Sequence, residues 1–342
     1  DTTWSRGLVD VYKRLVLIVL IIYFLFLSIN AQVIFLVYDL AKIQRTKLSK
    51  ERVRSAWIFL TPMCICLAVV AIYPLITTIN YSFTDARLGD LYNYNYVGWF
   101  HYETLFFYDE WWWVSVKNTF IFSFFSVFFE TIIGVTFALI LNNNMPARGI
   151  VRAAILIPWA IPTIVNAKMF QWMFNQQFGV FNEILMDLSI ISEPIAFLAY
   201  PDSSMAAAII VDVWKTTPFI TLLTLAALQM IPTDIYESTR IDGVSSWKVF
   251  WNITLPLIKP TLVIAIIFRT LDALRVFDLL YVLTTNSRET ASMSVYARQW
   301  LVDFMEVGQG SAASTLLFAF LTIATILYLI ITKTSFDRQG VY

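Results

Sequence analysis

Four charged residues stand at regular spacing in a strongly apolar stretch, "FRTLDALRVFD", at residues 268–278. They are Arg269, Asp272, Arg275 and Asp278, each three residues from the next and alternating in sign. Helical residues three apart are neighbours, so successive members of the row can pair. Charges at bilayer depth are costly and face a bundle interior or a water-filled cavity. The row could therefore bind the hydroxyl groups of a polar solute or hold helices together, and the sequence leaves both hypotheses open.

Two other apolar stretches carry polar side chains that suit the same chemistry. One contains Asp212, Lys215 and Thr216, and the other contains Trp159 and Thr163. Carboxylates and cations can pair with vicinal hydroxyls, and an aromatic ring can cover the C–H face of a sugar. Prolines flank the second set, and the carbonyl groups that they free are tolerated at membrane depth where they line a cavity.

The composition places these stretches in a membrane protein. Hydrophobic residues make up 58% of the 342 residues and charged residues only 14%, against roughly 25% charged residues in soluble domains. A net charge of zero gives no electrostatic footprint for nucleic acid. Cys64 and Cys66 have no partner His or second Cys pair nearby, so we expect buried thiols and no metal site.

Seven segments are long and apolar enough to cross the hydrocarbon, which takes about 20 residues. They are 15–36, 57–79, 119–141, 153–174, 205–228, 261–283 and 312–331.

Lysine and arginine counts in the connections predict which side each connection occupies. The segments 42–54, 142–152, 230–260 and the tail after 332 together hold thirteen, and we expect them in the cytoplasm. The segments 80–117, 175–205 and 284–311 hold four, and we expect them outside.

The first segment fits this orientation awkwardly. It places residue 1 outside, although Arg6, Lys13 and Arg14 precede the segment. Two explanations are compatible with these charges, an N-terminus outside the membrane or a further helix upstream of residue 1, and we favour the second.

The longest cytoplasmic connection, "IPTDIYESTRIDGVSSWKVFWNITLPLIKP" at 231–260, predicts two short helices. Thr233 or Asp234 can cap a helix that runs to about residue 241, and Gly243 can end it in a left-handed turn. A second helix would run from about 247 to 254, and the prolines after it would restart the chain into the membrane. Glu237 and its neighbours then project from a helix–turn–helix on the inner face.

This loop resembles the EAA loop of binding-protein-dependent ABC importer permeases, in the version of the maltose-type carbohydrate branch. The resemblance rests on Glu237, on Gly243 six residues later and on the run Ile253-Thr254-Leu255-Pro256. "LIPWAIPTIV" (156–165), "WKTTPF" (214–219) and "IFRTLDALRVFDLLYVLT" (267–284) are similar to that family too, particularly to its trehalose and α-glucoside members. The sequence departs from the pattern at 238–239, where Ser-Thr replaces two alanines.

The resemblance implies an all-α membrane protein, with a six-helix permease core and at least one extra N-terminal transmembrane helix. The domains implied are an extra helix at 1–41, a basic cytoplasmic linker at 42–56, a permease domain at 57–332 that contains the coupling loop 231–260, and a tail at 333–342.

The resemblance also assigns residues to two sites. Those implied for substrate binding are Trp159, Thr163, Asp212, Lys215, Thr216, Phe268, Arg269, Asp272 and Arg275. Those implied for coupling to an ATPase are Glu237, Ser238, Arg240, Asp242, Gly243 and Pro256. Asp278 matches no pocket position, so we expect it to be a counter-ion for Arg275. Many of these pocket positions are small or amide residues in the family's best-known member.

The function implied is that of a permease subunit of an ATP-driven importer for a disaccharide or small glycoside, in a bacterial inner membrane. The partners implied are a second permease subunit, two copies of a cytoplasmic ATPase and an external sugar-binding protein. None of the ten glycines precedes a lysine, so the chain has no Walker A motif. We therefore expect no catalysis and no cofactor in this chain, with ATP and Mg²⁺ bound by the ATPase.

Two other classes compete with this interpretation. An ion-gradient-driven sugar transporter would make use of Asp212 and Asp272, but it has no need of an EAA loop. A membrane enzyme would need a convergent nucleophile, base or metal site, and the sequence shows none.

Overall fold

The computed structural model describes residues 47–143 and 146–336. These residues are mostly helical and form no β-strand; the chain divides into two compact units, 1–84 and 85–342. The predicted extra helix at 15–36 lies outside the described residues. The all-helical fold predicted from the sequence is confirmed for the part that the structure describes.

The described part of the first unit is one long apolar helix. It consists of α2 (Lys47–Leu67), a π-helical turn (Ala68–Ile72) and α3 (Tyr73–Tyr81). Residues 54–81 of this helix are long and apolar enough to cross a membrane, which agrees with the span predicted at 57–79. Helix α2 begins ten residues before that predicted span, inside the segment expected to be a linker.

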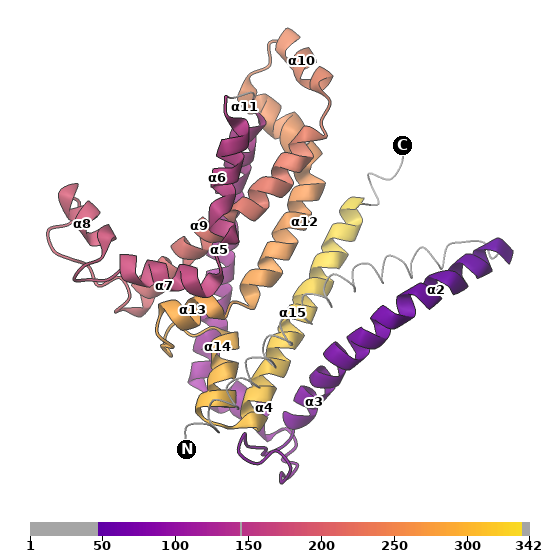
Figure 1. The fold of residues 1–342 in the computed structure, drawn as a ribbon, viewed down its shortest axis with the longest axis vertical. Coiled ribbons are helices and arrows are strands. Elements are labelled where there is room, and N and C mark those ends of the chain that lie inside the picture. Colours follow the sequence, from indigo (N-terminus) through magenta and orange to yellow (C-terminus); the bar gives the residue numbers. More distant parts are fainter. Residues whose placement is uncertain (1–46, 144–145, 337–342) are drawn as a thin grey trace. The chain divides into compact units, whose positions relative to one another are not determined.

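The second unit contains the remaining helices (Figure 1). Those at or near its outer connections are α4 (Phe100–Glu103), α8 (Val180–Asp187), α13 (Asp278–Leu283) and α14 (Met293–Arg298). The longer ones are α5 (Glu110–Asn142), α6 (Arg148–Ala160), α7 (Thr163–Met173), α9 (Pro201–Gln229), α12 (Leu255–Leu274) and α15 (Val307–Phe336). The inner connection carries α10 (Thr233–Ile241) and α11 (Ser246–Val249).

Helices α5, α9 and α12 pack against one another and form the centre of this unit. Gly134 permits the close approach of α5 to α9, because a Cβ atom there would lie 2.9 Å from Cγ2 of Ile220. Small residues commonly let membrane helices approach in this way. The polar residues of the site come from these three helices.

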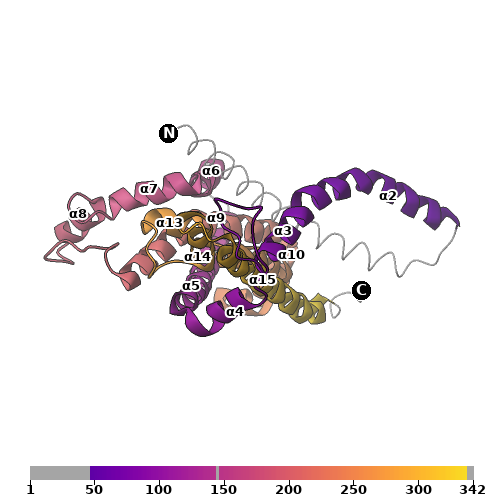
Figure 2. The ribbon, with the colours of Figure 1, turned by 90° about the horizontal axis from the view of Figure 1, so that it is seen from below.

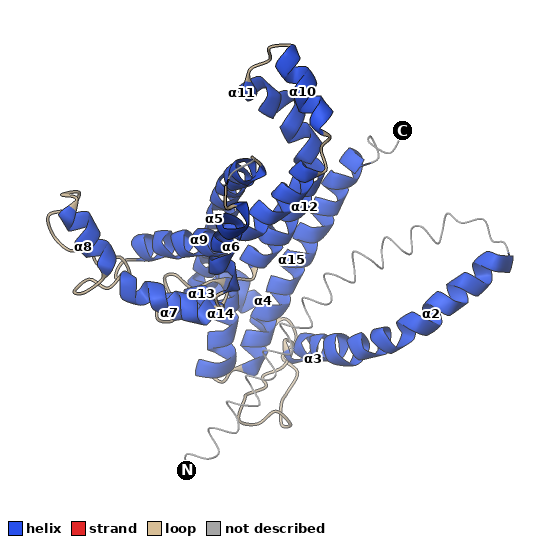
Figure 3. Cartoon of the chain, turned by 45° about the horizontal axis from the view of Figure 1, so that its top comes forward, coloured by secondary structure: helices blue, strands red, loops and turns tan. Residues whose placement is uncertain are grey.

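The ends of the second unit agree with the predicted sidedness. The C-terminal end of α5 and the pair α10–α11 lie at one end, and α4 and α14 lie at the opposite end (Figures 1 and 3). The first end carries connections expected in the cytoplasm, and the second carries connections expected outside. Helices α7 and α8 extend to one side of the central helices when the unit is seen from below (Figure 2).

The span predicted at 153–174 is not one continuous helix. Helices α6 and α7 meet at an angle of 92°. Ile161 is extended, with φ −74° and ψ 130°, because the residue before a proline is disfavoured in the helical region. The structure thus corrects the prediction of a straight span and places Thr163 at the first position of the second helix.

The helix that corresponds to the span predicted at 261–283 begins and ends earlier in the sequence than expected. A continuous helical path runs over residues 246–274 through α11, a π-helical turn (Phe250–Thr254) and α12. Pro256 lies at the N-terminus of α12 and does not interrupt this path. The short second helix expected to end near residue 254 is therefore the beginning of the transmembrane helix, about 43 Å long at 1.5 Å per residue.

The outer end of α12 lies within the charged row. Arg275, with φ −104° and ψ 17°, is its C-cap, and α13 starts only at Asp278. Two hydroxyl groups stabilise the break: Ser294 Oγ donates to the Arg275 carbonyl over 3.2 Å, and Ser292 Oγ donates to the Val276 carbonyl over 2.6 Å. The expected row on one continuous helix is thus divided between two helices.

Candidate functional site

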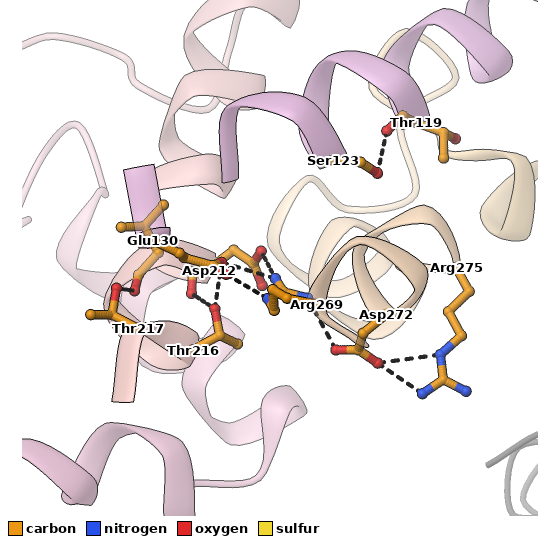
Figure 4. A network of polar contacts seen from close by, with 10 residues as sticks. Thr119, Ser123, Glu130, Asp212, Thr216, Thr217, Arg269, Asp272 and Arg275 are labelled. Atoms are coloured by element: carbon orange, nitrogen blue, oxygen red, sulfur yellow. Dashed lines mark hydrogen bonds and ion pairs between the residues drawn. The ribbon is translucent and has the colours of Figure 1, made fainter. Parts of the chain in front are cut away.

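Arg269 is the centre of a buried cluster of charges that joins three helices (Figure 4). Its Nε donates to Oε2 of Glu130 over 2.6 Å, and its Nη2 donates to Oε1 of the same residue over 3.0 Å. Nη2 also donates to Oδ2 of Asp212, on α9. Only 4% of Arg269 is exposed, so its guanidinium is held inside the protein by carboxylates from α5 and α9.

Thr216 completes the buried side of this cluster. Its Oγ1 lies 2.5 Å from Oε1 of Glu130 and 2.6 Å from the carbonyl oxygen of Asp212, one turn earlier on α9. Glu130 is fully buried. A carboxylate buried in this way is stabilised by charge-assisted hydrogen bonds, here from the Arg269 guanidinium.

Asp272 connects the buried side of the cluster to an exposed side. Its Oδ2 accepts from Nη1 of Arg269 over 3.1 Å, and its Oδ1 accepts from Nη2 of Arg275 over 2.8 Å. The Asp272 side chain is 51% exposed, whereas that of Arg275 is 16% exposed. Asp272 is thus an open carboxylate whose orientation is fixed by two guanidinium groups.

The expectation that Asp278 is the counter-ion of Arg275 is wrong. Arg275 forms its ion pair with Asp272, and Asp278 forms none among the residues that the structure describes. The physical reason is the end of α12 at Leu274, which places Asp278 on α13, beyond a non-helical break.

The residues predicted to bind substrate divide into a buried set and an accessible set. Asp212, Thr216 and Arg269 are buried. Lys215 and Thr163 are partly buried, and Phe268 and Trp159 are about half exposed.

The structure brings part of the predicted set together. Asp212, Arg269, Asp272 and Arg275 form one ion-pair network. Trp159 contacts a different part of α9, with its ring centroid 6.3 Å from that of Phe219. The network offers carboxylate oxygens and guanidinium N–H groups that can bind hydroxyls, and the role of the whole set in substrate binding stays a prediction.

A separate groove of about 1090 Å³ lies along α5 and α9. Its lining is mostly apolar, with Phe125 and Phe129 from α5 and Ile209 and Val213 from α9. It contains none of the residues predicted to bind substrate. The charged cluster contains four of the residues predicted to bind substrate and this groove contains none, so we take the charged cluster as the candidate site. In the described part, no group of three His, Cys, Asp or Glu residues is placed to hold a metal ion.

The predicted coupling loop has the local structure expected for its first helix. Helix α10 spans Thr233–Ile241, and Gly243 follows with φ +66°. The Val244 N–H donates to the Thr239 carbonyl over 3.1 Å, and the Gly243 N–H donates to the Arg240 carbonyl over 3.2 Å. These two bonds form the Schellman motif that ends a helix at a left-handed residue. The expected side-chain cap at Thr233 or Asp234 is absent, since Pro232 is the N-cap.

The residues predicted to couple to an ATPase lie on the surface of this loop. All six of them are exposed: Glu237, Ser238, Arg240, Asp242, Gly243 and Pro256. Ile241 (86% exposed) and Trp247 (71% exposed) lie beside them. The loop thus presents both charged and large apolar side chains at the end of the unit that carries the connections expected in the cytoplasm.

Glu130 is the residue of this site that sequence reasoning missed. It lies within the span predicted at 119–141, in "FFETIIG". The principle that drew attention to Arg269, that charges at membrane depth need a partner, applies to Glu130 as well. Its partner is 139 residues away in the sequence, so no local spacing could reveal it.

Comparison with known proteins agrees with this architecture. The family described as "binding-protein-dependent transport system inner membrane component" matches residues 130–338. The trehalose/maltose transport system permease protein MalF of Thermococcus litoralis is 49% identical over 219 residues, which are 64% of this chain and 73% of that protein. The trehalose transport system permease protein SugA of Mycobacterium tuberculosis is 32% identical over 277 residues, which are 81% of this chain and 88% of that protein.

A solved structure has the same fold. A chain of a bacterial alginate ABC transporter, in complex with an alginate pentasaccharide-bound periplasmic protein, superposes with a TM-score of 0.73 at 22% sequence identity. The superposition covers 85% of this chain and 98% of that one. The family match covers more than half of the chain, and it includes Glu130, the charged cluster and the coupling loop. This chain therefore belongs to the family of inner-membrane components of binding-protein-dependent transport systems.

Proposed function

We propose that this chain is a permease subunit of an ATP-driven importer for a disaccharide or small glycoside of the trehalose or maltose kind. It forms the translocation path together with a second permease subunit. Two copies of a separate cytoplasmic ATPase supply the energy, and an external sugar-binding protein delivers the substrate. The chain itself binds no ATP and catalyses no reaction.

The observation that carries this proposal is the physical link between the coupling loop and the charged cluster. Helix α10 is exposed at the cytoplasmic end, and residues 246–274 that follow it form one uninterrupted helical path. Arg269 and Asp272 lie in the last two turns of that path. A displacement of the loop by an ATPase would therefore move these side chains as part of a rigid element, as in known rigid-body transitions.

The sugar assignment is supported by the relatives and by the chemistry of the cluster. Two of the relatives are named as trehalose/maltose and trehalose permeases. The half-exposed carboxylate of Asp272 and the Arg275 guanidinium offer acceptors and donors to hydroxyl groups. Trp159 on α6 and Phe268 on α12 are about half exposed, and aromatic side chains of this kind can cover an apolar sugar face.

The experiment that tests the coupling is co-purification of the ATPase with the membrane subunits. Glu237→Lys reverses the charge of an exposed residue on α10, so we expect loss of the ATPase from the purified complex and loss of ATP-dependent uptake, with normal membrane insertion. Glu193→Lys makes the same change at an exposed residue of an outer segment and is the control. Retention of both ATPase binding and uptake in Glu237→Lys would contradict the proposed coupling.

A further inference from the structure

Glu130 is the one member of the charged cluster that neither the predicted substrate set nor the predicted coupling set includes. It is fully buried on α5, and it accepts two hydrogen bonds from one guanidinium group, at 2.6 and 3.0 Å. Paired N–H···O bonds of this kind fix the plane of an arginine as well as its position. Glu130 therefore determines where the Arg269 head group lies.

The position of Arg269 in turn determines what its remaining N–H groups can reach. With Nε and Nη2 directed to Glu130 and Asp212, Nη1 is left for Oδ2 of Asp272. Arg275 binds the other oxygen of Asp272. The half-exposed carboxylate is thus held on one side by a buried guanidinium and on the other by a more accessible one.

Arg269 forms ion pairs with three carboxyl groups, those of Glu130, Asp212 and Asp272. Loss of the Glu130 charge leaves the buried guanidinium with fewer acceptors than it has in the intact cluster. An uncompensated buried charge is strongly destabilising, so we expect the guanidinium to shift toward water or toward another partner.

We propose that Glu130 is a positioning residue for substrate recognition: it keeps the Arg269 guanidinium away from the substrate side and thereby sets the orientation of the Asp272 carboxylate that meets the sugar. The assignment of Asp272 to sugar binding rests on the proposed function above. Glu130 itself touches no substrate. Its effect on selectivity passes through Arg269, which links α5 to α12.

The variant Glu130→Gln separates this role from a purely structural one. Glutamine keeps the shape of the side chain, but one of its two terminal groups is a donor and cannot accept from the guanidinium. We expect Arg269 to leave its buried position in this variant and become accessible. Glu306→Gln is the matched control, because Glu306 pairs with Arg87 at 2.9 Å on the outer surface, away from the cluster.

The first measurement does not depend on transport. The intact complex is treated with phenylglyoxal, which modifies accessible arginine side chains, and the peptide that contains Arg269 is quantified by mass spectrometry. We expect modification of Arg269 to rise on the order of tenfold or more in Glu130→Gln, because the free energy lost with a charge-assisted hydrogen bond corresponds to a factor of that size. Modification of Arg269 should stay unchanged in Glu306→Gln. Continued protection of Arg269 in Glu130→Gln would overturn the positioning role.

The second measurement is substrate selectivity, expressed as the ratio of the uptake rates of trehalose and maltose by the reconstituted complex. We expect Glu130→Gln and Asp272→Asn to shift this ratio in the same direction, and the double variant to shift it no further, because coupled residues are not additive. Equal loss of both uptake rates in Glu130→Gln, with an unchanged ratio, would show a structural role only and overturn the proposal. Absence of ATP-dependent uptake of either sugar by the wild-type complex would instead contradict the proposed function, and the arginine modification would still decide where Glu130 places Arg269.

Discussion

Replacement of Arg269 by methionine is the most informative perturbation of the charged cluster. Methionine retains much of the side-chain length and removes the charge. The structure then leaves Glu130 fully buried and Asp212 nearly so, both without the guanidinium that now binds them. The variant therefore tests whether this arginine holds α5, α9 and α12 together.

The expected loss of stability follows from the burial of the two carboxylates. Removal of one partner from a buried ion pair destabilises a protein by about 3–5 kcal/mol. A loss of about 3 kcal/mol reduces the ratio of folded to unfolded protein by roughly two orders of magnitude. At roughly 2 °C for each kcal/mol, the apparent melting temperature should fall by about 6 °C or more.

The assay is the fraction of monodisperse complex that survives heating in detergent, measured by size-exclusion chromatography. The comparison variant replaces all three groups at once, as Glu130→Leu, Asp212→Leu and Arg269→Met. Replacement of a whole buried ionic group by apolar residues is often neutral or stabilising. We therefore expect the triple variant to recover most of the heat resistance that Arg269→Met loses.

Two results would refute this reasoning. Wild-type heat resistance in Arg269→Met would show that the cluster contributes nothing to helix packing. A triple variant no more stable than Arg269→Met would show that uncompensated charge is not the cause of the loss.

Other predictions concern the turn after α10, the contact between α5 and α9, and an outer loop. Gly243→Val should destabilise the coupling loop by about 1–2 kcal/mol, because the left-handed conformation (φ +66°) is unfavourable for a side chain; faster proteolysis after residue 243 would report it, and unchanged proteolysis would contradict it. Gly134→Ala should lower the melting temperature of the complex, since the new Cβ atom would meet Ile220 at 2.9 Å and overpacking costs about 1–3 kcal/mol; an unchanged melting temperature would contradict it. Hydrogen bonds from the backbone and side chain of Asn95 hold the pKa of Asp85 below its usual 3.8. The stability that they contribute is therefore present above pH 3.8 and is lost as the pH falls through the lower pKa of the folded state. Hydrogen exchange at the Asn95 amide, corrected for the intrinsic rate at each pH, should show this loss, and constant protection would contradict it.

The membrane spans were largely predictable because their signal is local. Apolar runs of sufficient length predicted the six spans from 57 to 331, and the structure has five continuous candidates and one bent pair in its described part. The break between α6 and α7 was harder to predict from the sequence, because Pro162 indicates that the helix is disturbed but does not indicate an angle of 92°. The early start of the helix over residues 246–274 was missed because Pro256 and Pro260 were expected to interrupt the chain, whereas the helical path continues through both of them.

The candidate site was only partly predictable because its contacts are not local. The spacing of Arg269, Asp272 and Arg275 predicted pairs three residues apart, and the structure has both. Asp278 continues the same spacing, but the helix ends before it, so the periodic argument fails there. The bond from Arg269 to Glu130 joins two spans, and only the packing of α5 against α12 brings these residues together.

The central claim, that the chain takes part in ATP-driven sugar import, is tested most directly by uptake into vesicles. The chain is reconstituted with its second permease subunit and its ATPase, and labelled trehalose and the sugar-binding protein are supplied on the outside. We predict uptake that requires ATP inside the vesicles and that persists when an ionophore abolishes the ion gradients. Uptake that follows an ion gradient in the absence of the ATPase would contradict the account.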